Sequence, residues 1–177
     1  MPVWADTDIQ SQVARVNDRL AQAETLHVVA IDRTPGGSNG TTYDCWYHRS
    51  GKYRVTWNGG GDAFDGKSRW ANTPGFGWHE DFPLDEESKG QWRWIGFESF
   101  FDPSVQAWSI SGVDGDQIQF KTTESAMSYG ILWWSKKTMR PAGYDYWVQN
   151  DYEHAIRYTK VEIDSKPPKG CFVPKRG

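Results

Sequence analysis

The stretch VARVNDRLAQAETLHVVAIDR, residues 13–33, contains a change of hydrophobic period that decides the fold class. Before Glu24, apolar residues recur at alternating spacings of four and three, which places them on one stripe of a helix. After Glu24, the run rich in Val and Ile is typical of a strand. We therefore predict an amphipathic helix over residues 7–23 that leads directly into a strand over residues 26–33. The stripe consists of Ile9, Val13, Val16, Leu20 and Ala23.

Short segments with a period of two follow this strand along the chain. Gly-rich turns separate them, and most connections have hairpin length, which leaves no room for the helices that link parallel strands. The segment 86–102 breaks this rhythm and could hold a short helix. We predict a mainly β chain of the α+β class, in which a curved antiparallel sheet forms an unclosed barrel wrapped around the N-terminal helix. The further predicted strands span residues 41–48, 52–58, 62–65, 68–72, 76–80, 105–111, 117–123, 129–135, 144–150 and 154–163.

Length and charge limit the classes of partner. The 177 residues suit one domain, residues 1–177, that is large enough to bury a core. The 20 basic and 23 acidic residues are interspersed and give a net charge of −3, so we expect no nucleic-acid partner. Because no apolar stretch approaches the roughly 20 residues of a membrane helix, we also expect a chain that does not span a membrane.

Two features bear on the compartment. Residues 1–5, MPVWA, resemble the end of a cleaved secretory signal, with a branched residue at Val3 and a small one at Ala5; an added tail is the alternative. Cys45 and Cys171 are the two cysteines of the chain. They are either two free buried thiols or, in an oxidising compartment, a disulfide that joins an early strand to the C-terminal segment.

The chain holds 11 tryptophans, and aromatic residues make up 15% of it. Along one predicted strand, Tyr53, Val55 and Trp57 share a face, because successive strand residues point to opposite sides. The rings exceed what a single helix stripe can cover. They either fill a wide core or line an apolar cavity whose wall includes Trp46, Trp57 and Trp70.

Four motifs, taken in order, resemble the LolA-like family of periplasmic lipoprotein carriers, which sort lipoproteins to the outer membrane. The first is the helix followed by a strand, and the third has the form DGK-x-x-W-x-x-x-P. Together the motifs span most of the chain. They are VARVNDRLAQAETLHVVAIDR (residues 13–33), CWYHRSGKYRVTW (45–57), FDGKSRWANTPG (64–75) and TKVEIDSKPPKGCFVPKRG (159–177).

The resemblance implies an unclosed barrel with a helical lid over an apolar cavity that takes lipoprotein acyl chains. Arg49 aligns with the basic residue that holds the lid in the family, although Ser50 stands where the family usually has proline. The implied protein is periplasmic or otherwise exported, is not an enzyme, needs no cofactor, and exchanges its ligand with envelope proteins of the inner and outer membranes. The cavity residues on this interpretation are Trp46, Tyr53, Val55, Trp57, Trp70 and Trp133.

Two other classes of function fit the same composition. A carbohydrate-binding module or a glycan-active protein would use exposed indoles as stacking platforms. A partner of an envelope sensor would have a filled barrel and no ligand. The candidate platforms are Trp78, Trp92, Trp94 and Trp108.

No local pattern predicts a catalytic or metal site. His79 and Asp81 could share a metal with His48 or His154 if the fold brought them together, but a solvated turn is the simpler interpretation. Gly59-Gly60-Gly61 lacks the Lys of a phosphate-binding loop. The carboxylates that could serve glycoside chemistry, none of which is selected as a pair, are Glu86, Glu87, Glu98 and Asp102.

Overall fold

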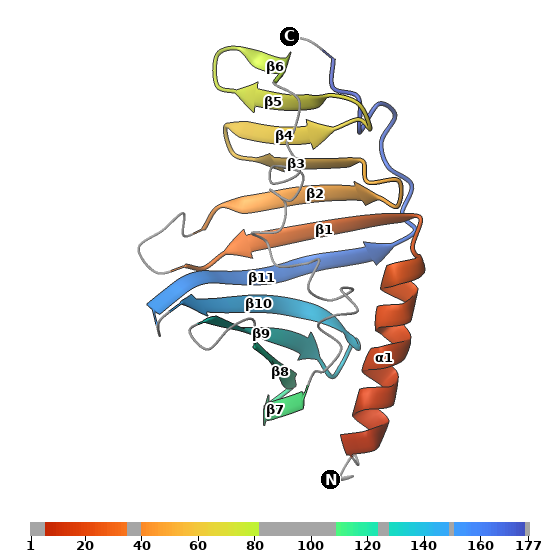
Figure 1. Cartoon of the computed structure of the whole chain (residues 1–177), viewed down its shortest axis with the longest axis vertical. Coiled ribbons are helices and arrows are strands. Elements are labelled where there is room, and N and C mark those ends of the chain that lie inside the picture. The colour runs from red at the N-terminus through yellow and green to blue at the C-terminus, as the bar shows by residue number, and fades with distance from the viewer. Residues whose placement is uncertain (1–5, 35–39, 82–108, 124–127, 149–150, 176–177) are drawn as a thin grey trace.

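The structure is a computed structural model that describes residues 6–34, 40–81, 109–123, 128–148 and 151–175 (Figure 1). In these ranges the chain forms one helix, α1 (Asp6–Gln22), and eleven strands. The strands are β1 (Thr25–Asp32), β2 (Thr42–His48), β3 (Tyr53–Trp57), β4 (Gly60–Phe64), β5 (Arg69–Thr73), β6 (Gly77–Glu80), β7 (Ser109–Asp114), β8 (Gln117–Thr123), β9 (Ser128–Ser135), β10 (Arg140–Val148) and β11 (Asp151–Ile163).

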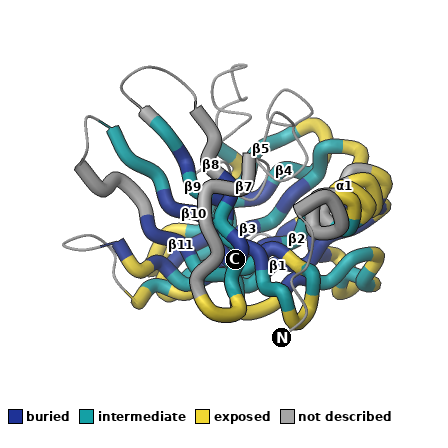
Figure 2. The backbone as a smooth tube through the Cα atoms, turned by 90° about the horizontal axis from the view of Figure 1, so that it is seen from below, coloured by how far each residue is buried: buried dark blue, intermediate teal, exposed yellow. Residues whose placement is uncertain are grey.

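All eleven strands belong to one sheet, in the order β6-β5-β4-β3-β2-β1-β11-β10-β9-β8-β7. Every neighbouring pair is antiparallel. The sheet consists of two meanders, β1 to β6 and β7 to β11, which the pairing of β1 with β11 joins at the centre. Seen along the sheet, the strands follow a strong curve that leaves β6 and β7 at its two ends (Figure 2). The predicted mainly β chain with an open, curved antiparallel sheet is confirmed.

Helix α1 starts at Asp6 and ends at Gln22, one residue before each predicted boundary, and two residues separate it from β1. It lies beside one end of the central strands and crosses their direction (Figure 1). Leu20 and Ala23 are buried in the core and Val16 packs against it, so the C-terminal end of the helix carries its described core contacts. The predicted wrapping of the sheet around the helix is not confirmed by these contacts.

Strand β10 begins at Arg140, four residues before the predicted start. The added residues include Pro141, which has no N–H to donate to a ladder. The structure accommodates this residue beside an irregularity between Pro141 and Gly143, where the register with β9 shifts. The short helix predicted within 86–102 lies outside the described residues.

The two sides of the sheet differ in burial. We define the core face as the side of β1 that carries Leu26, Val28 and Ala30, all at most 3% exposed. The opposite face carries His27 and Val29. The other core-face residues with at most 3% exposure are Tyr43, Tyr53, Val55, Ile118, Phe120, Leu132, Trp134 and Ile156.

Candidate functional site

The core face of the sheet is the candidate site, and its side chains form two rows that run across the strands. A residue and its register partner on the next strand point to the same side, so the pairing lists define each row. The first row contains Ile163, Leu26, Tyr47, Tyr53, Phe64 and Arg69. The second row contains Val161, Val28, Cys45, Val55, Asp62, Ala71 and His79.

Both rows change from apolar to charged toward the same end of the sheet, the second row at Asp62 on β4 and the first row at Arg69 on β5. From β11 to β3 they hold aliphatic and aromatic residues and Cys45, and from β4 onward they include Asp62 and Arg69. Aromatic contacts connect the apolar part, for example Tyr43 to Trp57 and Tyr53 to Phe64, each pair with ring centroids 6.2 Å apart. The core face is therefore amphipathic along the sheet.

The charged end is organised around an ion pair. Arg69 donates to Asp62 from Nε at 3.1 Å and from Nη2 at 2.5 Å, and this hydrogen bonding raises the pKa of Arg69. Asp81 lies 3.8 Å from Nη1 of the same guanidinium. The Tyr53 hydroxyl donates to Asp62 at 3.4 Å; burial, followed by the charge of Asp62, raises the pKa of Tyr53.

The six predicted cavity residues are divided between the two faces. Tyr53, Val55 and Trp57 lie on the core face. The other three, Trp46, Trp70 and Trp133, pair with Arg54, Ala63 and Gly143 on the opposite face, so the structure does not bring all six to one wall.

Polar partners explain why these three indoles lie on the opposite face. Trp46 stacks on His27 with ring centroids 4.0 Å apart. The indole nitrogen of Trp70 donates to Asp65 at 3.1 Å, and that of Trp133 donates to Asp145 at 2.7 Å. An indole N–H needs an acceptor when it leaves water, and carboxylates supply two of them here.

Sequence reasoning missed Trp134, which is fully buried on the core face between Ile118 and Pro141. Alternation requires Trp133 and Trp134 to point to opposite sides, but it does not say which side is which. The pairing with β10 decides this, because Asp145 lies on the side of Trp133.

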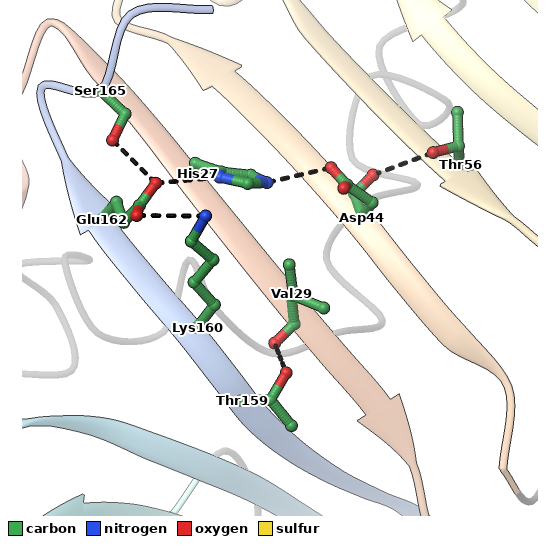
Figure 3. A network of polar contacts seen from close by, with 8 residues as sticks. All are labelled: His27, Val29, Asp44, Thr56, Thr159, Lys160, Glu162 and Ser165. Carbon is green, nitrogen blue, oxygen red and sulfur yellow. Dashed lines mark hydrogen bonds and ion pairs between the residues drawn. The ribbon is translucent and has the colours of Figure 1, made fainter.

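The opposite face carries a polar network centred on His27 (Figure 3). Its Nδ1 lies 3.1 Å from Glu162 on β11 and its Nε2 lies 3.1 Å from Asp44 on β2. Ionised carboxylates only accept, so both contacts are hydrogen bonds at once only when both ring nitrogens carry hydrogen. Hydrogen bonds from His27, Lys160 and Ser165 lower the pKa of Glu162 to about 2.

Arg49 lies in the turn between β2 and β3 and contacts the end of α1. Its backbone N–H donates to the carbonyl of Glu24 at 2.9 Å, and its guanidinium reaches the carbonyl of Gln22 at 3.5 Å. A cation at a helix C-terminus meets the last unpaired carbonyls and the negative end of the dipole. Arg49 thus connects the helix to the sheet.

Cys45 and Cys171 are free buried thiols, so the disulfide left open by the sequence is not formed. Cys45 points to the core face, whereas the carbonyl of Cys171 accepts a hydrogen bond from Arg54, whose side chain lies on the opposite face. Burial raises the pKa of both thiols, to about 11 for Cys171, which keeps them protonated at neutral pH.

Of the predicted stacking platforms, the structure describes only Trp78. It lies on the opposite face with its centroid 4.9 Å from the Arg54 guanidinium carbon. The remaining platforms and the four candidate carboxylates lie outside the described residues; these are Trp92, Trp94, Trp108, Glu86, Glu87, Glu98 and Asp102.

The described residues contain no group of three or more His, Cys, Asp or Glu side chains that could hold a metal ion. His48 instead contacts Glu24 at 3.0 Å, and Nδ1 of His79 lies 3.2 Å from the carbonyl of Gly77. The side chain of His154 is outside the described part of the structure. In the helix that the structure describes, no segment is long and apolar enough to cross a membrane.

No curated protein and no family model matches the sequence. Among solved structures, an uncharacterized conserved protein from Thermus thermophilus matches with a TM-score of 0.55 at 9% identity, covering 93% of this chain and 92% of that one. LprF from Mycobacterium bovis also matches with a TM-score of 0.55, at 10% identity, covering 92% of this chain and 96% of that one. The chain shares its fold with these two structures. A LolA superfamily protein from Nitrosomonas europaea covers 96% of this chain at 9% identity, with a TM-score of only 0.35, so the fold assignment rests on the first two structures.

Proposed function

We propose that the chain is a carrier or binding protein of the bacterial cell envelope that holds lipoprotein acyl chains or another hydrophobic ligand against the core face. The observation that carries the proposal is the continuous band of apolar side chains that the two rows form between β11 and β3. The resemblance of the sequence motifs to the LolA-like carriers supports it. Each buried methylene contributes about 0.8 kcal/mol, so a chain of about a dozen gains roughly 10 kcal/mol before the cost of association.

Three of the predicted residues are the proposed ligand contacts. Tyr53, Val55 and Trp57 lie on the core face at the side of the apolar surface nearest its charged end. Aromatic rings suit such a surface because they present large apolar area with few rotatable bonds. Binding requires no cofactor and no catalytic step, which is consistent with a carrier.

Arg49 is the proposed latch. It connects the C-terminal end of α1 to the turn between β2 and β3 through Gln22 and Glu24. One guanidinium hydrogen bond at 3.5 Å is weak enough to open and close without unfolding the sheet. In this proposal the helix and the curved sheet enclose the ligand, and the release of the contact of Arg49 with Gln22 accompanies ligand entry.

The proposed location is the periplasm or another exported compartment, with envelope proteins of the inner and outer membranes as exchange partners. The resemblance of the sequence motifs to periplasmic lipoprotein carriers supports export. Free, protonated thiols at Cys45 and Cys171 are compatible with that location because both are buried away from oxidants.

Two measurements test ligand binding. Mass spectrometry of an organic extract of the purified protein should detect a co-purifying lipid. In addition, the uncharged dye N-phenyl-1-naphthylamine should gain fluorescence with the protein, and Trp57→Leu should weaken dye binding about tenfold. Trp46→Leu is the matched control, because it removes an indole of similar burial from the opposite face. Absence of lipid and of dye binding, or equal effects of the two substitutions, contradicts the proposal.

The latch is tested separately. Arg49→Leu should leave the thermal unfolding midpoint within a few degrees, because Arg49 is exposed, while it changes the rate of dye release severalfold. Arg49→Lys keeps the charge near Gln22 and should lie between the wild type and Arg49→Leu. Identical release rates for all three proteins rule out a latch at this position.

A further inference from the structure

The charged end of the core face carries more negative than positive charge. Among the side chains that the structure describes at this end, Asp62, Arg69 and Asp81 provide one guanidinium and two carboxylates, and the second row ends at His79. These side chains continue the same rows that form the apolar surface. A ligand that lies along the rows therefore places its apolar chain over β1 to β3 and its polar end over β4 to β6.

Arg69 is already engaged. Two of its nitrogens bond Asp62, and the side chains of Arg69 and Asp62 are 17% and 13% exposed, so little water screens the pair. An incoming carboxylate or phosphate that bound the Nε and Nη2 edge of this guanidinium would have to displace Asp62. That displacement would leave a partly buried carboxylate without its ion partner, beside a second negative charge on Asp81.

Hydroxyl and ammonium groups of a ligand are favoured at this end, because they donate hydrogen bonds to carboxylates. Asp81 is 34% exposed and its carboxylate can accept a hydrogen bond from either group. The Tyr53 hydroxyl, at the border of the apolar surface, donates to Asp62 and adds a further oxygen there. The side chains that the structure describes at this end thus favour donors and disfavour anions.

We propose that the ligand is an amphiphile whose polar end lies at Asp62, Arg69 and Asp81 and is uncharged or cationic, and that these residues select against anionic amphiphiles. This inference rests on the proposed function, because it takes the core face as the ligand site. The selection operates at the head group, whereas the core-face aliphatic and aromatic residues accept the chain whatever its head.

The test is competition against bound N-phenyl-1-naphthylamine with amphiphiles of one chain length, each below its critical micelle concentration. Monolauroylglycerol is uncharged, dodecylamine is cationic and laurate is anionic. We expect the first two to displace the dye at concentrations about tenfold lower than laurate, a ratio that shrinks as salt screens the carboxylates.

Asp81→Asn should bring laurate close to monolauroylglycerol, since it leaves one carboxylate against one guanidinium. Asp62→Asn tests the ion pair directly, and Asp81→Asn keeps the test valid if the loss of Asp62 unfolds the protein. Glu80→Gln is the matched control: it changes the net charge equally, but Glu80 pairs with Trp70 on the opposite face.

The outcomes separate the two claims. If no amphiphile displaces the dye, or the dye does not bind, the proposed function fails. If laurate and monolauroylglycerol compete equally in the wild type, the ligand site survives and the head-group selection is wrong. A shift with Glu80→Gln as large as with Asp81→Asn assigns the effect to net charge alone and also overturns the selection.

Discussion

The core face and the opposite face use the same strands in different ways. On the core face, β1 and β3 contribute Val28 and Val55, buried and without charge. On the opposite face, β1 contributes His27, which connects the carboxylates of Asp44 and Glu162. The core face thus buries apolar area, whereas side-chain hydrogen bonds connect neighbouring strands on the opposite face.

The comparison teaches that the two faces contribute to different properties. A ligand site needs apolar surface that is not consumed by specific polar partners, and only the core face offers that. The cross-strand contacts of the opposite face hold β2, β1 and β11 in register, because each pairs a residue with its direct neighbour or its diagonal one. Substitutions on the core face should therefore affect both packing and ligand binding, whereas substitutions on the opposite face should affect stability alone.

The largest expected effect is loss of core-face packing. Phe120→Ala on β8 removes a ring that is 1% exposed, so the free energy of unfolding should fall by about 4 kcal/mol. Gln119→Ala, its neighbour on the opposite face, should cost less than about 1 kcal/mol. Urea unfolding of both variants makes the measurement; equal losses would mean that the two faces do not differ in packing.

Asp145 is an exception to the contrast between the two faces, because it lies on the opposite face and yet is fully buried. It accepts hydrogen bonds from Trp133 and, through both of its oxygens, from Arg157. Asp145→Asn should cost about 3 kcal/mol, since it leaves a partly buried guanidinium without its counterion. The double variant Asp145→Leu with Arg157→Met should recover much of that loss in the same urea experiment; no recovery would show that the pair is not the cause.

A smaller effect is expected where a ring lies directly on the backbone. A Cβ at Gly61 would come within 2.8 Å of the Trp78 ring, so Gly61→Ala should destabilise by about 2 kcal/mol. In a Trp78→Ala background the same substitution should cost little, and the difference is the coupling energy of the pair. Additive effects in this double-mutant cycle contradict the contact.

The smallest effect is a pH dependence on the opposite face. Because the pKa of Glu162 falls from 4.5 to about 2 on folding, chiefly through His27, its contribution to stability is complete above about pH 4.5 and is lost as the pH falls toward 2. Glu162→Gln should flatten the dependence of the urea midpoint on pH in that window, and His27→Gln should reduce it. An unchanged slope in His27→Gln would remove His27 as the cause.

Local periodicity predicted the helix, the antiparallel sheet and the shared face of Tyr53, Val55 and Trp57. It failed to group the tryptophans, because a strand pattern shows which residues share a face and not which face meets the core. Trp46 shares a side with Asp44 and His48, and only the register with β1 shows that this side is the one with His27.

The charged end of the core face also depends on pairing that no local pattern reveals. Asp62 and Arg69 are seven residues apart, on two strands joined by the turn at Asp65 and Gly66. An Asp-Gly pair of this kind is typical of a tight hairpin turn. The register of β4 with β5 decides which side chains the turn brings together. The ion pair of Asp62 with Arg69 is therefore visible only in the structure.

The central position of β11 has a consequence for biosynthesis. β1 is made early and β11 more than a hundred residues later, yet they are hydrogen-bonded neighbours at the middle of the sheet. Until the ribosome has delivered residues 151–163, one long edge of β1 and one of β10 stay available to other chains. Such late, distant pairing makes folding slow and leaves the unpaired edges of the two half-sheets prone to aggregation until the halves join.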